Sequence, residues 1–176
     1  SKHGHTLNAQ TIIWANGFNI TDVCDKIPVK PVSGQVTYLK SNSQTSKLKL
    51  NFSYGQFFSQ SFEGYHQIGS SFNRNTNVNF NQNDQNKNLS SIPEFLKERA
   101  INSNIDLNEY RVSIRSSTKD RMPFFCKLNE IKQNNFENEY VLGGMGAWGF
   151  VYAPYYAELM MRELLNENPV INLKLD

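Results

Sequence analysis

The sequence has 176 residues, enough for one good hydrophobic core or for two sub-domains that share it. Hydrophobic residues make up 39 % of it and the mean hydropathy is −0.55, which describes a soluble globular protein, and no apolar run approaches the roughly 18 residues of a membrane span. The formal net charge of +2 is too small to indicate nucleic-acid binding by itself, and no apolar signal-peptide region follows Ser1–His5.

The first elements in chain order are predicted to be strands. The apolar run Thr11–Ala15, which Asn16-Gly17 follows, is typical of a strand buried on both faces, as in a parallel sheet. Ile27–Pro31 is extended, because its prolines exclude a helix interior. Phe62–Tyr65 is predicted to be a hairpin turn within an antiparallel sheet. The strands of that sheet are predicted in four β-rich runs, Gln35–Leu39, Leu48–Phe52, Gln56–Phe62 and Tyr65–Phe72.

The next elements are predicted to be helical. Asp84–Ile101 has helical periodicity, but Pro93 interrupts it. Ser91–Glu94 has the pattern of a capping box, so a second helix is predicted to start there. Leu107–Ser116 alternates well enough to be a further strand, and the polar segment Lys127–Glu139 is predicted to be a loop.

The C-terminal part is predicted to form a short strand, a glycine-rich turn and a helix. Gly144, Gly146 and Gly149 spell G-x-G-x-x-G, but the sequence has no second βαβ unit after them to complete a dinucleotide-binding fingerprint. The turn is therefore predicted to close a cofactor site whose opening half lies elsewhere. The last helix is predicted to pair Glu158 with Arg162 and to bury the opposite face, which holds Ala157, Met160, Met161, Leu164 and Leu165.

These elements predict an α+β fold, in which an antiparallel substrate-domain sheet with flanking helices joins the closing strands and last helix of a cofactor-binding domain. We expect residues 1–26 and 140–176 to belong to the cofactor-binding domain and residues 27–139 to form the substrate-binding domain.

Two arginines are candidates for substrate binding. Arg111 and Arg115 lie four residues apart on a predicted strand and so project from the same face. A guanidinium there can clamp a substrate carboxylate through two hydrogen bonds. The alternatives are simple exposure or a salt bridge to Asp106, Glu109 or Asp120.

The residue pattern gives little support for a metal site, a disulfide or a nucleophilic catalytic site. Cys24 and Cys126 form no C-x-x-C motif and the three histidines are scattered, so no metal site or disulfide is expected and a reducing cytoplasm fits. No Ser-His-Asp or Cys-His arrangement is supported by spacing. Phe57, Phe58 and Phe62 could stack on a ring-shaped substrate, although such strand aromatics are ordinarily core.

Four segments, namely Ile12–Gly17, Pro31–Gln35, Arg115–Pro123 and Gly144–Glu158, together resemble the D-amino-acid oxidase-like family of FAD-dependent amine oxidoreductases. Ile12–Gly17 is similar to the strand that ends beside the flavin, and Pro31–Gln35 to a "P-V-R-G-Q" motif in which Ser33 here replaces the arginine. Arg115–Pro123 is similar to "R-x-x-T-x-D-x-x-P", and Gly144–Glu158 to the final flavin-edge turn and helix.

Within that family, Ile68–Asn75, Asp84–Leu89 and Arg111–Arg115 resemble the FAD-dependent C-terminal domains of bifunctional tRNA 5-methylaminomethyl-2-thiouridine biosynthesis enzymes. Ile68–Asn75 resembles "I-G-A-S-Y-x-R-N", Asp84–Leu89 resembles the helix that follows, and Arg111–Arg115 resembles "R-x-G-x-R". The resemblance implies a cytoplasmic enzyme with tRNA as its partner, which removes the carboxymethyl group of carboxymethylaminomethyl-uridine at the wobble position as glyoxylate. The alternatives are an oxidase of a small free amino acid such as glycine or sarcosine, or a non-catalytic binding module.

The resemblance also implies which residues form the site. Arg115 would be the catalytic residue that holds the substrate carboxylate, with Phe58 and Arg74 as further substrate contacts. Ala147-Trp148 replaces a pair that contains an arginine in relatives. The βαβ half that binds the ADP portion is not in this sequence, so weak binding of FAD by this chain alone is expected. The FAD contacts would be Ala15, Asn16, Gly17, Gly144, Met145, Gly146, Ala147, Trp148 and Gly149.

Overall fold

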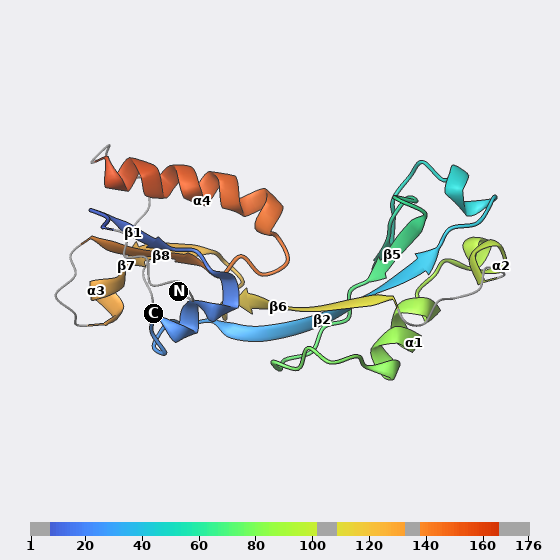
Figure 1. Ribbon diagram of the computed structural model, residues 1–176, viewed down its shortest axis with the longest axis horizontal. Coiled ribbons are helices and arrows are strands. Elements are labelled where there is room, and N and C mark those ends of the chain that lie inside the picture. Colours follow the sequence, from blue (N-terminus) through green and yellow to red (C-terminus); the bar gives the residue numbers. More distant parts are fainter. Residues whose placement is uncertain (1–7, 102–108, 133–137, 166–176) are drawn as a thin grey trace. The chain divides into compact units, whose positions relative to one another are not determined.

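The computed structural model describes residues 8–101, 109–132 and 138–165, which form two sheets with flanking helices (Figure 1). The predicted α+β class is therefore confirmed. The chain divides into two compact units, of which unit 1 comprises Ser1–Pro31 with Arg115–Asp176 and unit 2 comprises Val32–Ile114. The expected domain boundaries, after residues 26 and 139, differ from these divisions, and the functional assignment of the domains stays a prediction.

Unit 1 contains a three-stranded sheet in the order β1-β8-β7, made of β1 (Ile12–Trp14), β8 (Glu139–Gly143) and β7 (Phe124–Lys127). The first pair is parallel and the second antiparallel. The 3₁₀ helix η1 (Gly17–Asp22) follows β1, and the short helix α3 (Leu128–Ile131) follows β7. Figure 1 shows α4 (Gly149–Leu164) along one face of this sheet. The core of the unit consists of Ile20, Cys24, Ile27, Phe124, Leu128 and Val141.

Two predictions for unit 1 need correction. The parallel pairing of β1 is confirmed, but Ile12 and Ile13 are 38 % and 40 % exposed on an edge strand of the described sheet, so β1 is not buried on both faces. Residues 127–139 are not simply a loop, since they contain α3 and the first residue of β8, although residues 133–137 lie outside the described part.

The buried stripe of α4 also differs from the predicted one. Met160 is buried as expected, but Met161 and Leu165 are 45 % and 61 % exposed. The other buried residues are Tyr156 and Leu159, so the stripe follows an i, i+3, i+4 pattern that is rotated by about one residue from the predicted face. The predicted ion pair between Glu158 and Arg162 is present.

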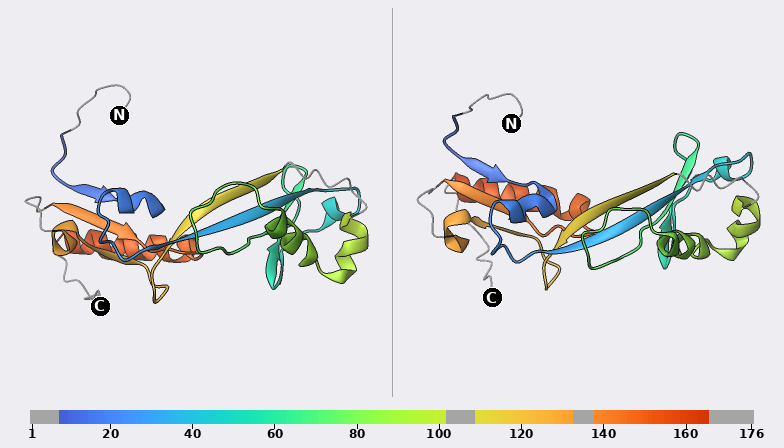
Figure 2. Two further views of the ribbon diagram at one scale, coloured as in Figure 1. Left: turned by 90° about the horizontal axis from the view of Figure 1, so that it is seen from below. Right: turned by 60° about the horizontal axis from the view of Figure 1, so that its bottom comes forward.

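Unit 2 is built on a five-stranded sheet in the order β3-β4-β5-β2-β6, which confirms the predicted antiparallel sheet. Figure 2 shows β2 and β6 running side by side. The hairpin turn at Phe62–Tyr65 is confirmed, with Glu63 and Gly64 both at positive φ, as in a type I′ turn. The predicted strand Leu48–Phe52 contributes only Phe52, and Leu107 lies outside the described residues. The strands are β2 (Lys30–Lys40), β3 (Phe52–Tyr54), β4 (Gln56–Phe58), β5 (Tyr65–Gly69) and β6 (Tyr110–Ser117).

Two helices cover one face of this sheet. They are α1 (Gln82–Ser90) and α2 (Glu94–Ile101), and the predicted break at Pro93 separates them. The predicted capping box at Ser91 is wrong, because Ser91 is the C-cap of α1 and its hydroxyl donates to the Asn88 carbonyl. Between sheet and helices lies a core of Leu39, Phe58, Ile68, Ile92 and Leu96.

A buried polar network joins β2 to α1 and to the segment after β5. The backbone N–H of Gln35 donates to Ser71 Oγ (2.9 Å), and the Gln35 carbonyl accepts from Ser71 N–H and from Asn88 Nδ2. Gln35 Oε1 also accepts from the N–H of Asn81, the N-cap of α1 (2.8 Å). Gln35 is 1 % exposed and Asn88 is fully buried. Such bonds fix the position of α1 on the sheet, since unpaired buried amides are costly.

His66 is a buried histidine held in its neutral form. Its Nδ1–H donates to the Ser59 carbonyl at 2.8 Å, its ring lies 4.8 Å from that of Phe58, and the residue is fully buried. Nε2 has no hydrogen-bond partner among the described residues. Burial lowers the pKa of His66, and the bond to Ser59 offsets only part of that effect.

We predict that unit 2 loses stability as the pH falls from about 7.5 to about 5. Because the pKa of His66 is lowered in the folded state, the unfolded state binds a proton more readily. The contribution of neutral His66 to the free energy of unfolding is therefore complete above the unfolded-state pKa of 6.5 and is lost as the pH falls below it. Urea unfolding at several pH values measures this dependence. His66→Asn, which keeps a donor for Ser59, should flatten the curve, and curves of equal slope for both proteins would contradict the prediction.

Candidate functional site

The turn between β8 and α4 requires glycine at its first position. Gly144 has φ +73°, and a Cβ atom there would lie 2.8 Å from Thr118 Cγ2 and 3.0 Å from Phe124 Cδ1. The backbone therefore approaches two side chains more closely than any other residue permits. Gly146 also has a positive φ, +53°, but the space beside it is open.

Hydrogen bonds tie this turn to the end of β6. The N–H of Gly146 donates to the Ser116 carbonyl at 2.9 Å, and Met145 forms an isolated antiparallel bridge with Ser117. A Cβ atom on Gly146 would lie 3.9 Å from Ser117 Oγ, so the Ser117 side chain is on the side of the turn. The turn and the end of β6 thus form one structure within unit 1.

The N-terminus of α4 presents backbone donors at the same place. Its N-cap, Trp148, makes no side-chain cap bond and is 62 % exposed. The N–H groups of Val151 and Tyr152 bond back to the Trp148 carbonyl. The first amides of a helix have no partner within the helix, and they favour an anion or a polarised carbonyl group.

Arg115 lies two residues before Ser117 on β6 and therefore shares its face of the strand. Ser116, which points the other way, is buried. Arg115 is half-buried, and burial lowers the pKa of its guanidinium, which nevertheless stays charged at neutral pH. By this alternation the arginine is on the same side of β6 as the glycine turn.

The loop after β6 is held by its own hydrogen bonds. Thr118 Oγ1 donates to the Met122 carbonyl (2.8 Å), and the Met122 N–H donates to Asp120 Oδ1 (2.9 Å). The bonds from Met122 and Thr118 hold the pKa of Asp120 below its usual value. Arg121 adopts a positive φ and Pro123 is buried. Most of the "R-x-x-T-x-D-x-x-P" pattern therefore specifies a turn.

Residues after β1 reach the same edge of the sheet as the glycine turn. Because β1 and β8 are parallel, their carboxyl ends lie together, so Ala15, Asn16 and Gly17 follow β1 where Gly144 follows β8. These three residues are exposed, and Gly17 has φ +66°. The residues predicted to contact the cofactor in unit 1 are thus gathered at one edge.

The two predicted substrate contacts in unit 2 differ in exposure. Phe58 is 2 % exposed and packs in the core against Phe52 and His66, so its position does not fit the expected contact. Its neighbour Phe57 is 44 % exposed, and Arg74 is also exposed. Side chains alternate between the two faces of β4, and the sequence alone did not show which of Phe57 and Phe58 would be exposed.

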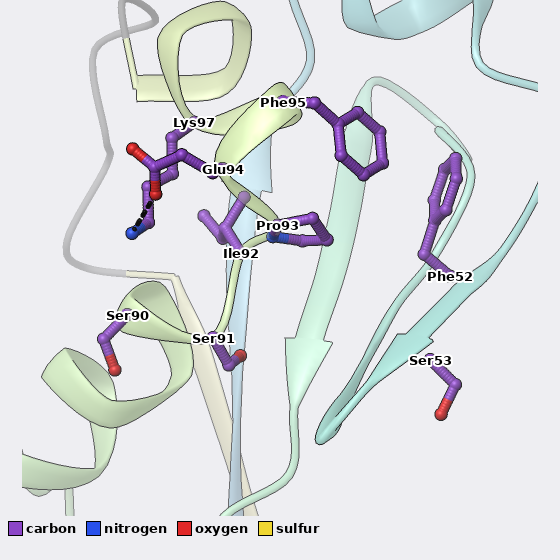
Figure 3. Close-up of a pocket in the computed structure, with 9 residues that line it drawn as sticks. All are labelled: Phe52, Ser53, Ser90, Ser91, Ile92, Pro93, Glu94, Phe95 and Lys97. Carbon is purple, nitrogen blue, oxygen red and sulfur yellow. Dashed lines mark hydrogen bonds and ion pairs between the residues drawn. The ribbon is translucent and has the colours of Figure 1, made fainter.

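A groove of about 580 Å³ lies in unit 2 between β3 and the start of α2 (Figure 3). Figure 3 shows Phe52 and Phe95 on one side of it and the ion pair of Glu94 and Lys97 on the other. None of the predicted site residues lines this groove. Its charged groups neutralise each other, so it offers no evident catalytic chemistry.

The described residues contain no other reactive constellation. Burial, with Glu130 and Cys24 nearby, raises the pKa of the Cys126 thiol to about 12, so it is no nucleophile at neutral pH. No three of the described His, Cys, Asp and Glu residues come together as a metal site. Within the same residues, no helix has both the length and the apolar character that crossing a membrane requires.

Known proteins match this chain almost along its whole length. The sequence model of the family described as FAD dependent oxidoreductase (DAO) matches residues 1–163. Two relatives are tRNA 5-methylaminomethyl-2-thiouridine biosynthesis bifunctional proteins MnmC. The protein of Aeromonas hydrophila is 25 % identical over an alignment that covers 95 % of this chain. The protein of Idiomarina loihiensis is 28 % identical over an alignment that covers 94 % of it. The chain spans only 29 % and 27 % of their lengths.

Solved structures show the same fold. Iminodiacetate oxidase from Chelativorans sp. BNC1 and glycine oxidase from Geobacillus kaustophilus both superpose with a TM-score of 0.74 at 16 % identity. The match covers 97 % of this chain in each case, and 46 % and 45 % of the two oxidases.

We predict that Gly144→Ala destabilises unit 1 considerably more than Gly146→Ala. Both substitutions place alanine at positive φ, at about 1–2 kcal/mol. Only the methyl group added at Gly144 would collide with Thr118 and Phe124, which adds about 1–3 kcal/mol. Chemical denaturation of the two variants measures the difference. Equal losses would show that the close approach at Gly144 is not a constraint.

Proposed function

Because the chain belongs to the DAO family of FAD-dependent oxidoreductases, we propose that it forms part of an FAD-dependent amine oxidoreductase that acts on carboxymethylaminomethyl-uridine at the tRNA wobble position. The observation that carries this proposal is the position of Arg115 on the face of β6 that Ser117 shares, beside the glycine turn and the N-terminus of α4.

The residues around the turn fit one edge of a flavin. The side of Gly146 is open, since a Cβ atom there would meet nothing closer than Ser117 Oγ at 3.9 Å, so a ring can approach the backbone. The uncapped start of α4 favours negative charge on a carbonyl edge of that ring. Residues Gly144–Gly149, together with Ala15, Asn16 and Gly17, would hold this edge.

Arg115 would bind the substrate carboxylate. The Arg115 guanidinium is half-buried and charged, and a substrate carboxylate could form two charge-assisted hydrogen bonds with it. In this role Arg115 orients the adjacent CH₂ group. Thr118, Asp120 and Met122 support the arginine indirectly, because their bonds fix the chain that follows it.

Bound FAD would supply the two-electron oxidation of the N–CH₂ bond, after which water hydrolyses the imine, and glyoxylate and the 5-aminomethyl-uridine leave. The protein residues contribute binding, orientation and electrostatics. The same arrangement would serve a small free amino acid such as glycine or sarcosine, since these also present a carboxylate next to an amine-bearing CH₂. The similarity to the two MnmC proteins favours the tRNA substrate.

The complementary half of the FAD-binding domain would be a partner of this chain. The solved oxidases extend well beyond the part that this chain matches, and β1 is an edge strand with Ile12 and Ile13 exposed. An edge strand with exposed apolar residues is suited to pairing with a further strand.

The first prediction concerns Arg115→Ala in the intact enzyme. Losing a charge-assisted carboxylate pair of about 1.5–3 kcal/mol should lower kcat/KM on carboxymethylaminomethyl-modified tRNA roughly tenfold or more. Lys119→Ala, which removes an exposed cation from the following loop, is the matched control and should leave the rate unchanged. Full turnover by Arg115→Ala would remove this residue from the site. Turnover of free glycine but not of modified tRNA would favour the small-amine alternative.

The second prediction concerns FAD binding by the 176-residue chain alone. Without a first-strand phosphate loop and its ribose carboxylate, the chain should bind FAD only weakly. Titration of FAD with the protein, followed by flavin fluorescence, measures the affinity. A stoichiometric, tightly bound yellow complex would contradict the prediction.

A further inference from the structure

One face of the five-stranded sheet is covered by helices and the other is not. On β2, Gln35, Thr37 and Leu39 face α1 and α2, with exposed fractions of at most 1 %. Since side chains alternate along a strand, Val36, Tyr38 and Lys40 point to the opposite side. We call this opposite side the open face.

The strand register extends the open face across β5 and β4. Residues directly opposite each other in neighbouring strands point to the same side. Val36 lies opposite Gly69, and Gly69 lies opposite Phe57. Likewise Tyr38 lies opposite Gln67, and Lys40 opposite Tyr65. The intervening residues His66, Ile68 and Phe58 are buried under the helices, which supports this division.

A contact between two aromatic rings shows toward which face of the sheet the side chains of β6 point. The Tyr110 ring lies 4.8 Å from that of Phe80, the residue that precedes the N-cap of α1, so Tyr110 points to the helix-covered side. Arg111 and Ser113 therefore point to the open face, and both are exposed, whereas Val112 and Ile114 are half-buried.

The residues of the open face are suited to a polyanion that carries aromatic rings. Sheet faces that pack on another layer are rich in Val, Ile and Leu, but this face has a single aliphatic residue between three aromatic rings and two cations. None of the five strands contains an aspartate or glutamate. One carboxylate lies on this side: Glu109, just before β6, shares the side of Arg111 by alternation and accepts a hydrogen bond from the Tyr65 hydroxyl. The open face comprises Val36, Tyr38, Lys40, Ser53, Phe57, Tyr65, Gln67, Glu109, Arg111 and Ser113.

We propose that the open face of unit 2 binds single-stranded RNA. Unpaired bases stack on Phe57 and Tyr38, while Arg111 and Lys40 neutralise phosphates. This inference rests on the proposed function, because the substrate base would lie in an anticodon loop, whose bases are unpaired. Arg111, which the sequence left as a clamp or a structural partner, takes part in neither of the two salt bridges found among the described residues.

The test is the affinity of the 176-residue chain for a fluorescently labelled, unmodified anticodon stem-loop RNA, followed by anisotropy at several salt concentrations. Phe57→Ala should weaken binding about tenfold, and Phe57→Tyr, which keeps the ring, should not. Arg111→Gln should also weaken binding and reduce the salt-dependence slope by about 0.7. Phe95→Ala is the matched control, since Phe95 is 63 % exposed but lies on the helix-covered side. This variant should bind the RNA with the affinity of the unchanged protein. Thermal unfolding confirms that each variant is folded.

The outcomes separate this inference from the proposed function. Equal affinities for Phe57→Ala, Arg111→Gln and the unchanged chain, or no binding of the stem-loop by the chain, would overturn the inference. If the intact enzyme also turns over modified tRNA with an unchanged KM after both substitutions, the proposed function stands without it. If the intact enzyme neither binds nor modifies tRNA but oxidises a free amino acid, both are wrong. Equally tight binding of a fully paired duplex would exclude base stacking on the sheet.

Discussion

The hydrogen bond from Gly146 N–H to the Ser116 carbonyl is the constraint on which the candidate site depends. It joins a turn near the C-terminal helix to a strand about thirty residues earlier in the sequence. The bond can form only because Gly144 has no side chain to hold the turn away from Thr118 and Phe124. Its consequence is chemical, since it places an arginine-bearing strand end beside helix amides that favour negative charge. Neither group alone would define a site.

Unit 2 depends on a different constraint, the buried side chain and backbone of Gln35. Buried amides are unfavourable unless their hydrogen bonds are made, so a network of them specifies one arrangement more strictly than aliphatic contacts do. Here the network includes Ser71 and Asn88, which come from segments that resemble the family motifs, and Asn81, which lies between those segments. These motifs thus have a structural role as well. By fixing α1 on one side of the sheet, the network determines which strand residues are left on the open face.

The sequence predicted the elements that local chemistry determines. Glu63-Gly64 formed a turn because glycine supports its geometry, Pro93 separated two helices because it lacks an N–H, and the glycines before α4 formed a turn. Elements of four residues, such as β7 and α3, were missed because they are too short to show a period. Sequence reasoning could not tell which of Phe57 and Phe58 is exposed, because a shift of one residue in a strand inverts its faces and only the pairing with β5 fixes the register.

The family resemblance suggested a site role for Arg115, but the residue pattern alone could not place it beside the glycine turn, since that depends on a bond between distant segments. It also sets a limit on what this residue can discriminate. The carboxylate of a free amino acid and that of a carboxymethylamino group are chemically alike, so a guanidinium binds both with similar strength. Selection between a small amine and a modified nucleotide must therefore come from contacts with the rest of the substrate. Unit 2 offers such contacts on its open face, where Lys40 and Arg111 lie among aromatic rings and the Glu109 carboxylate is bonded to the Tyr65 hydroxyl, an arrangement that suits a nucleic acid better than a small zwitterion.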